Sequence, residues 1–96
     1  MALVLFAIGA TLAQRTVSGK VTDAQGVPLI GASILVKGTS TGTVTDLDGT
    51  YSVSVPDGSK TLVFTYTGFS TQEITLGASN TINLTMEESG AGAQPG

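Results

Sequence analysis

Short alternating segments separated by turn residues run from Val17 to Met86, and this pattern limits the fold more than any other feature of the chain. Apolar and polar residues alternate within each segment, which is the period of a half-buried β-strand. We expect strands over residues 16–22, 32–37, 43–47, 50–55, 61–67, 70–76 and 81–86. About seven short strands at this spacing, with no helical period, predict an all-β sandwich or barrel.

The residues between the segments predict particular turns. Asp23 to Gly26 is expected to form a turn in which the aspartate bonds its own backbone two residues on. Asp48-Gly49 is a strong hairpin signal, so we expect residues 43–47 and 50–55 to pair with each other. Residues 61–67 form the most hydrophobic segment and are expected at the centre of a sheet. Leu35 gives the second strand an apolar residue on each face, which suggests cover on both sides.

Composition narrows the classes of function. The chain has 96 residues, enough for one domain, and it contains neither histidine nor cysteine. Ser-His-Asp and Cys-His catalysis and histidine-ligated metal sites are therefore excluded. The net charge is −3, and the cations Arg15, Lys20, Lys37 and Lys60 are scattered along the sequence. Such a chain has no electrostatic footprint for nucleic acid.

The first residues form an apolar leader. Residues 2–13 read ALVLFAIGATLA, which is too short to span a bilayer as a helix but matches the apolar region of a signal peptide. Thr11-Leu12-Ala13 before Gln14 is similar to a cleavage site, although no basic residue precedes the apolar run. We expect a leader over 1–14, a folded domain over 15–88 and a flexible tail over 89–96. The alternative for the leader is a hydrophobic strand of the domain.

The remaining enzyme possibility is a carboxylate pair, Asp46 and Asp48, two residues apart at a predicted hairpin end. A glycosidase needs such a pair at a set distance across a cleft, with the pKa of one carboxyl raised by burial. We expect instead that Asp48 serves the turn and that Asp46 is solvated. The same residues are a weak candidate for calcium, because the further oxygen ligands of an EF-hand are missing. We therefore predict no catalytic, cofactor-binding or metal-binding residues.

Aromatic residues and one sequon give weaker signals. Tyr51, Phe64 and Tyr66 follow strand alternation and are expected in the core, whereas Phe69, after Gly68, is the aromatic residue with the best chance of contacting a ligand. Asn83-Leu84-Thr85 matches a glycosylation sequon, but its place in a strand favours a chance match.

The turn and strand residues together resemble the carboxypeptidase regulatory-like domain, most closely the version at the N-terminus of SusC/RagA-type TonB-dependent outer-membrane receptors. The resemblance covers Arg15 to about Glu88 and rests on four motifs, none of them specific by itself. They are Gly19-x-Val21-x-Asp23-x-x-Gly26-x-Pro28-Leu29-x-Gly31-Ala32, Val36-Lys37-Gly38-Thr39, Gly42-Thr43-x-Thr45-Asp46-x-Asp48-Gly49-x-Tyr51 and Leu62-x-Phe64-x-Tyr66-x-Gly68-Phe69.

The resemblance implies a seven-strand Greek-key sandwich of the transthyretin (prealbumin) type with no known catalytic residues. It also implies a periplasmic position before the plug of an outer-membrane barrel that imports glycans or peptides. A receptor would continue into plug and barrel after Glu88, so we expect either a fragment of a receptor or a stand-alone protein. The partners are then a receptor's plug and barrel or identical subunits, without nucleic acid, and glycan or peptide cargo is implied by the resemblance alone.

Three hypotheses remain open. The first is an exported, non-enzymatic accessory domain of a receptor at the periplasm or outer membrane. The second is an extracellular subunit whose apolar leader completes a neighbour's sandwich by strand addition and so builds a filament. The third, an enzyme, has little support from the sequence.

Overall fold

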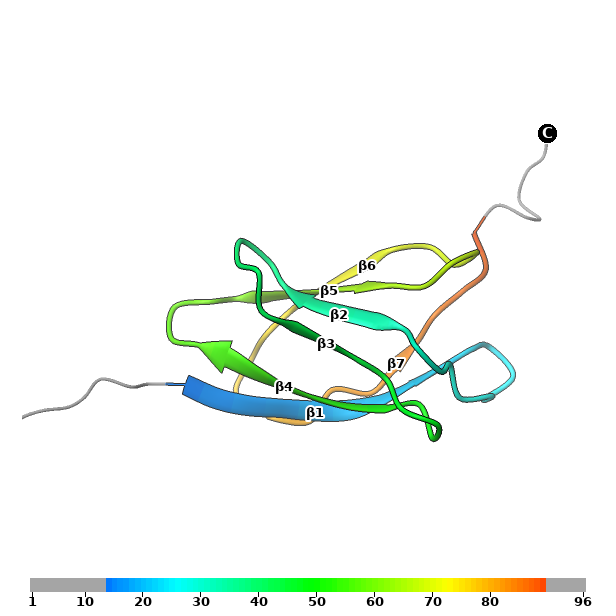
Figure 1. The fold of residues 1–96 in the computed structure, drawn as a ribbon, viewed down its shortest axis with the longest axis horizontal. Coiled ribbons are helices and arrows are strands. Elements are labelled where there is room, and N and C mark those ends of the chain that lie inside the picture. The colour runs from blue at the N-terminus through cyan, green and yellow to red at the C-terminus, as the bar shows by residue number, and fades with distance from the viewer. Residues whose placement is uncertain (1–13, 90–96) are drawn as a thin grey trace, which may run out of the picture.

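The computed structural model describes residues 14–89, which form a sandwich of two β-sheets without a helix (Figure 1). The strands are β1 (Gln14–Thr22), β2 (Ser33–Val36), β3 (Gly42–Val44), β4 (Thr50–Pro56), β5 (Thr61–Thr65), β6 (Gln72–Thr75) and β7 (Leu84–Thr85). Within this part of the chain, no helix has the length and apolar character needed to cross a bilayer. The predicted leader over 1–14 lies outside the described residues except for Gln14, and the predicted tail over 89–96 lies outside them except for Ser89.

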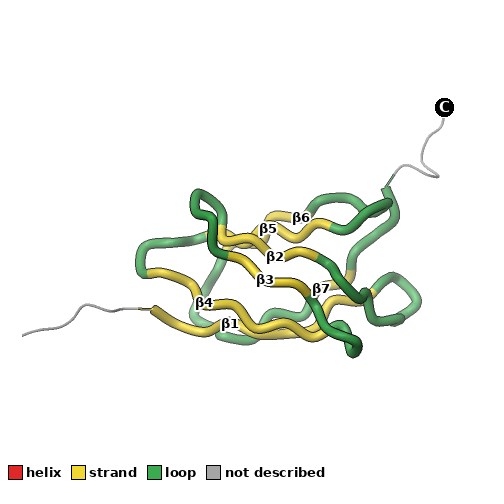
Figure 2. Tube along the Cα trace, in the orientation of Figure 1, coloured by secondary structure: helices red, strands yellow, loops and turns green. Residues whose placement is uncertain are grey.

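The two sheets have the orders β4-β1-β7 and β3-β2-β5-β6, and the tube in Figure 2 shows them as two layers. All neighbouring strands are antiparallel except β1 and β7, which run parallel. The chain changes sheet between β1 and β2, between β3 and β4, between β4 and β5, and between β6 and β7. The predicted seven-strand Greek-key sandwich of the transthyretin type is confirmed, and β5 lies inside its sheet, as its hydrophobicity predicted.

Alternation along each strand builds the core between the two layers. In β4, Tyr51, Val53 and Val55 are buried while the residues between them are exposed. The same period buries Leu62 and Phe64 of β5, as predicted. Tyr51 and Phe64 meet across the layers in an edge-to-face pair with ring centroids 5.6 Å apart, a favourable geometry for aromatic rings. Leu35 lies on the outer face and is 39% exposed, so the suggestion that β2 is covered on both sides was wrong.

The predicted hairpin between residues 43–47 and 50–55 was also wrong. A tight turn does form, because Asp46 N donates to Thr50 O over 2.9 Å and Gly49 N donates to Asp46 O over 2.9 Å. Beyond this turn the arms separate: β3 pairs with β2 in one sheet, and β4 pairs with β1 in the other. The turn is therefore a corner between the two layers. The Asp-Gly signal correctly indicates a local turn, but the partner of each strand depends on residues far away in the sequence.

The last segment of the domain forms one edge of the first sheet, beside β1. Residues 80–86 run beside β1 through bonds from Ser18 N to Asn80 O (2.9 Å), Ile82 N to Ser18 O (2.8 Å) and Met86 N to Thr22 O (2.8 Å). Asn83 supplies a side-chain acceptor where the backbone pairing is interrupted, since its Oδ1 accepts from Lys20 N over 2.9 Å. Met86 is fully buried and completes the core at this end.

Candidate functional site

The turns gather at two ends of the sandwich with different charge. One end consists of residues 23–32, 45–49, 66–71 and 86–89, and we call it the acidic end (Figure 1). Its charged residues are the carboxylates Asp23, Asp46, Asp48, Glu87 and Glu88. The opposite end carries Arg15, Lys37 and Lys60 together with Asp57, on β1 and on the turns at residues 37–41 and 57–60. The turns of the acidic end therefore carry carboxylates alone, although the net charge of the chain is only −3 and Lys20 of β1 lies opposite Thr50, beside the Asp46 turn.

Two turns at the acidic end share one hydrogen-bonding scheme. Asp23 Oδ1 accepts from Gln25 N at 2.8 Å and from Val27 N at 2.9 Å. Asp46 Oδ1 accepts from Asp48 N at 2.9 Å and from Thr50 N at 3.0 Å. Both follow an Asp-x-x-Gly-x spacing, with Gly26 and Gly49 at positive φ. Short polar side chains that bond the backbone ahead of them fix such turns. The spacing is visible in the sequence, and it predicted the role of Asp23 correctly.

Asp46 is exposed, as expected, but it also takes the turn role that was expected for Asp48. Asp46 holds the turn, and its Oδ2 also accepts from Thr50 Oγ1 over 2.6 Å. The Thr50 hydroxyl bond is the largest cause that lowers the pKa of the Asp46 carboxyl below its usual value, and the backbone N–H groups of Thr50 and Asp48 add to it. A general acid needs a raised pKa, so Asp46 does not fit that part. Among residues 14–89, no three acidic side chains form a metal-binding group.

Thr45, which precedes the Asp46 turn, attaches residues 29–32 to it from inside the protein. Its side chain is buried, and its hydroxyl donates to Leu29 O over 2.5 Å while accepting from Ala32 N over 2.8 Å. Backbone bonds from Thr45 N to Ala32 O (2.9 Å) and from Gly31 N to Thr45 O (3.1 Å) complete the attachment. Buried polar groups need such partners. Residues 29–32 are thus fixed against residue 45, and sequence alternation alone did not single out Thr45.

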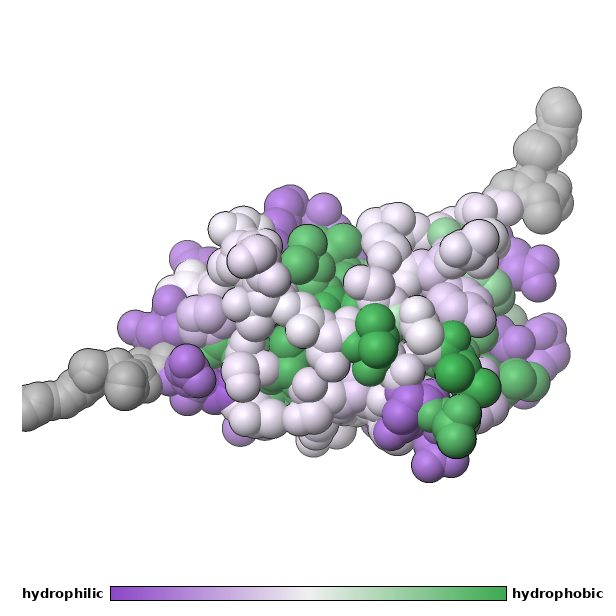
Figure 3. Space-filling model, in the orientation of Figure 1, coloured by the Kyte–Doolittle hydropathy of each residue, from purple (hydrophilic) through white to green (hydrophobic). Residues whose placement is uncertain are grey.

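Three large apolar side chains are exposed to water at the acidic end. Val27 is 53% exposed, Ile30 is 51% exposed and Leu47 is 80% exposed. We call these three residues the apolar tip. Figure 3 shows hydrophobic surface beside hydrophilic surface in the region of the β3–β4 turn. Exposed apolar side chains held by ordered turns and bordered by charge are typical of a contact surface.

A hollow of about 320 Å³ lies at the same end, and we call it the acidic hollow. Its lining consists of Asp23, Ala24, Gln25, Phe69, Met86, Glu87 and Glu88. Its walls are joined by bonds from Ser70 N to Glu87 O and from Ser89 N to Gly68 O, each 2.9 Å long. Phe69 is half-buried and packs beside Tyr66, with ring centroids 5.4 Å apart. Phe69, which the sequence had marked, therefore reaches a concave surface, while Tyr51 and Phe64 lie in the core as predicted.

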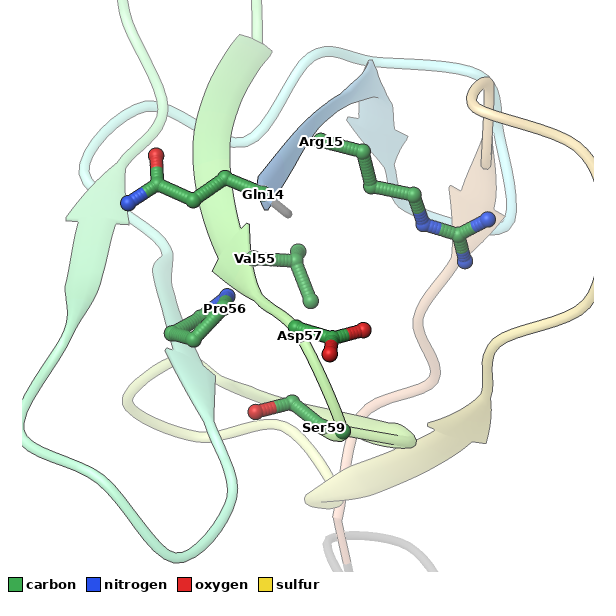
Figure 4. A pocket seen from close by; sticks show the side chains of 7 residues that line it. Gln14, Arg15, Val55, Pro56, Asp57 and Ser59 are labelled. Atoms are coloured by element: carbon green, nitrogen blue, oxygen red, sulfur yellow. The ribbon is translucent and has the colours of Figure 1, made fainter. Parts of the chain in front are cut away.

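A second hollow, of about 330 Å³, lies at the opposite end around the start of β1 and the β4–β5 turn. In Figure 4 the side chains of Gln14 and Arg15 diverge, with Val55 and Asp57 between them. Arg15 Nη2 donates to Gly77 O over 2.8 Å, so its guanidinium is anchored to the backbone. Ser59 is the nucleophilic side chain in this lining, and the lining offers it no histidine or lysine as a base.

Comparison with known proteins gives one family and a set of relatives. Residues 17–94 match the model of the CarboxypepD_reg-like domain. The chain is 45% identical over 75 residues to TonB-dependent receptor P3 of Formosa agariphila, covering 77% of this chain and 8% of the receptor. It is 40% identical over 81 residues to TonB-dependent receptor SusC of Bacteroides thetaiotaomicron, covering 84% of this chain and 8% of the receptor. The chain thus spans a small fraction of the length of the curated relatives that it matches.

Solved structures agree with the fold. A chain in the crystal structure of a type II cohesin–X-dockerin complex from Acetivibrio cellulolyticus, an N-terminal interface mutant, superposes with a TM-score of 0.54 at 23% identity. The match covers 76% of this chain and 57% of that chain. At this identity the likeness shows the sandwich alone.

Proposed function

Because this chain belongs to the CarboxypepD_reg-like domain family, we propose that it functions as a non-enzymatic interaction module of a TonB-dependent receptor. The identity to receptors P3 and SusC carries this proposal, since it extends over most of the folded sandwich. The exposed apolar tip supports it, because a module that acts by contact needs a surface suited to a partner.

The site geometry favours contact over catalysis. The Asp46 carboxylate is committed to its turn by three hydrogen bonds, which hold it in the charged form. Asp48 lies in the same turn, so the pair does not span a cleft of the kind that a glycosidase requires. We therefore propose that the module carries no reaction of its own.

We further propose that the chain is exported and works on the periplasmic side of the outer membrane. The support is the signal-peptide-like composition of residues 2–13 together with the likeness to receptors. Intact-mass measurement of the protein from an expressing bacterium tests this directly. A mature N-terminus near Gln14 is expected, and a mature chain that keeps residues 1–13 would contradict it.

The sandwich also has an edge that suits the filament alternative. Val21 N donates to Gly49 O over 2.8 Å, which sets the alternation of hydrogen-bonded pairs along β1 and β4. By that alternation, the backbone groups of Ser52 and Ser54 point away from β1 at the edge of the sheet. A strand from a second copy would pair there. A monodisperse monomer by light scattering would exclude the filament, and polymers lost on deletion of residues 2–13 would support it.

A domain exchange tests the receptor proposal. Residues 14–89 would replace the matching segment of the Bacteroides thetaiotaomicron receptor, with a receptor that lacks the segment as the control. We expect the exchanged receptor to import its substrate at close to the rate of the unmodified one. Import no better than in the deletion, at equal receptor abundance by immunoblot, would contradict the proposal.

A further inference from the structure

We propose that the acidic hollow and the apolar tip together form a docking surface for a partner-protein segment that carries lysine or arginine beside large aliphatic residues. The inference rests on the proposed function in one respect, namely that the module acts through a protein partner. It adds the face that is used and the chemistry of the segment that binds there.

Carboxylates surround the hollow. Asp23, Glu87 and Glu88 line the hollow, whereas the ion pair in the described residues, Lys37–Glu73, lies elsewhere on β6 and the β2–β3 turn. The carboxylates do not come together as a metal-binding group. Acidic groups spread around a rim suit an organic cation better than a metal ion, because a metal needs converging oxygen ligands at short distance.

The lining of the hollow also has an apolar part. Phe69 gives the hollow an apolar wall, above the buried Met86. Lysine and arginine bury their aliphatic stems on apolar surface while the charged head stays near water and carboxylates. A cation beside an aromatic ring gains further attraction. A hollow of about 320 Å³ has room for one such side chain.

The apolar tip explains what flanks the cation. Val27 N donates to Asp23 Oδ1, so the turn that carries Val27 also forms one wall of the hollow. Thr45 joins residues 29–32, which carry Ile30, to the turn that carries Leu47. The surface is therefore fixed before a partner arrives, and little conformational freedom is lost on binding. Large aliphatic residues next to the cation would cover Val27, Ile30 and Leu47.

The chain's own C-terminal residues do not fit this surface, and a second copy fits it only in part. Residues 90–96 read GAGAQPG and contain no cationic side chain, so the chain's own C-terminal residues lack the charge that the hollow selects. A second copy would have to present the opposite end. There, Arg15 is bonded to Gly77 O and Lys37 is paired with Glu73. Of the three cations at that end, this leaves Lys60 for such a contact, so self-association is a separate outcome of the test below.

Titration with synthetic peptides tests the proposal on the complete chain. The probe is acetyl-Leu-Lys-Leu-Lys-Leu-amide, with glutamate in place of lysine in one control peptide and serine in place of leucine in another. Backbone amide shifts of the ¹⁵N-labelled protein report where each peptide binds. We expect the probe to shift the amides of Ala24, Gln25 and Phe69 and to leave those of Gly58 and Ser59 unchanged.

Matched variants separate the two parts of the surface. Glu87→Gln with Glu88→Gln removes charge from the rim and should weaken probe binding by about threefold or more. Leu47→Ser should weaken probe binding by a similar factor. Without peptide, both variant proteins should give the spectrum of the native fold. Asp57→Asn removes a carboxylate from the opposite end and should change nothing.

Several results would overturn the inference: shifts confined to the opposite end, equal binding of the glutamate peptide, or unchanged affinity in the Glu87/Glu88 variant. Loss of the Ala24 and Phe69 signals on concentration without peptide would name a second copy as the occupant and would also overturn it. The domain exchange above keeps the two proposals apart. Restored import without peptide binding would contradict only the proposed docking surface. Peptide binding without restored import would contradict only the proposed receptor role.

Discussion

The carbonyl oxygen of Ile82 lies 1.8 Å from the point that a β-carbon on Gly19 would occupy. The close approach exists because residues 80–86 pass beside β1 and Tyr51 Oη donates to the same carbonyl over 2.8 Å. Gly19 is therefore required by a crossing of two segments and not by a turn.

We predict that Gly19→Ala destabilises the protein by at least about 2 kcal/mol, because backbone atoms have to move to admit the methyl group. Urea denaturation measures the loss. Gly77→Ala is the matched control: a β-carbon there meets nothing within 4 Å, so its free energy of unfolding should stay within about 0.5 kcal/mol of the wild-type value. Equal stability of the two variants would show that Ile82 does not hold this position.

Thr45→Val keeps the shape of the side chain and removes its hydroxyl. Leu29 O then loses a donor and Ala32 N loses an acceptor inside the protein. We expect a loss of about 2–3 kcal/mol in the free energy of unfolding, because buried polar groups are left unpaired. Thr43→Val, on the neighbouring strand β3, is the control. The outcome that contradicts this account is a Thr45→Val protein as stable as the control.

The hydrogen-bonded carboxylate of Asp46 should make the stability of the fold depend on pH in the acidic range. Its pKa is lower in the folded state than the usual value of 3.8, so the folded protein favours the carboxylate. The contribution is present above pH 3.8 and is lost as the pH falls through the folded-state pKa. Asp46→Asn should flatten the fall of stability between about pH 4 and pH 2 relative to wild type. Denaturation at a series of pH values measures it.

Asp48→Asn alters the same turn without touching these hydrogen bonds and serves as the control. Its pH profile should keep the wild-type shape. If both variants flatten the profile equally, the effect belongs to the general charge of the acidic end and not to the Asp46 turn.

The buried phenol of Tyr51 should make the stability of the fold depend on pH in the alkaline range. Burial raises the pKa of its phenol from 10.0 to about 12. The folded state therefore favours the neutral phenol, and the stability it contributes is complete below pH 10.0 and is lost as the pH rises toward 12. Tyr51→Phe should remove this loss, and at neutral pH it should cost about 1 kcal/mol because the bond to Ile82 O is gone.

Absorbance titration at 295 nm follows the phenolate, and denaturation at pH 8 and pH 11 follows the stability. Tyr66→Phe is the comparison, since the hydroxyl of Tyr51 is the one that bonds to the segment beside β1. A phenol at position 51 that ionises at 10 in the folded protein would contradict the burial argument.

Much of the fold could be read from local pattern. The buried residues of β4 and β5 were predicted because the two-residue period of a strand is written directly into the sequence. The Asp23 turn was predicted for a similar reason, since its hydrogen bonds join residues only two to four positions apart. Phe69, just after a glycine that ends a strand pattern, lines a hollow, and its contact with a ligand stays a prediction.

Errors occurred where distant segments compete for the same partners. Asp48-Gly49 predicts a turn, but β4 pairs with β1 across the other sheet because burial of Tyr51, Val53 and Val55 needs that layer. The turn role was assigned to Asp48 because it stands next to Gly49, whereas the bonds to Thr50 at the start of β4 come from Asp46.

By itself, the sequence determined the strands, the turns, the absence of histidine and cysteine chemistry and the resemblance to one family, because each depends on residue type and short spacing. Only the tertiary structure decided which strands pair and why position 19 has no room for a side chain. It also decided that one hollow is lined by Asp23, Phe69, Glu87 and Glu88. These facts depend on contacts between residues that lie far apart in the chain. The period of a single strand holds no information about them, because the partner is chosen by the burial of the whole core.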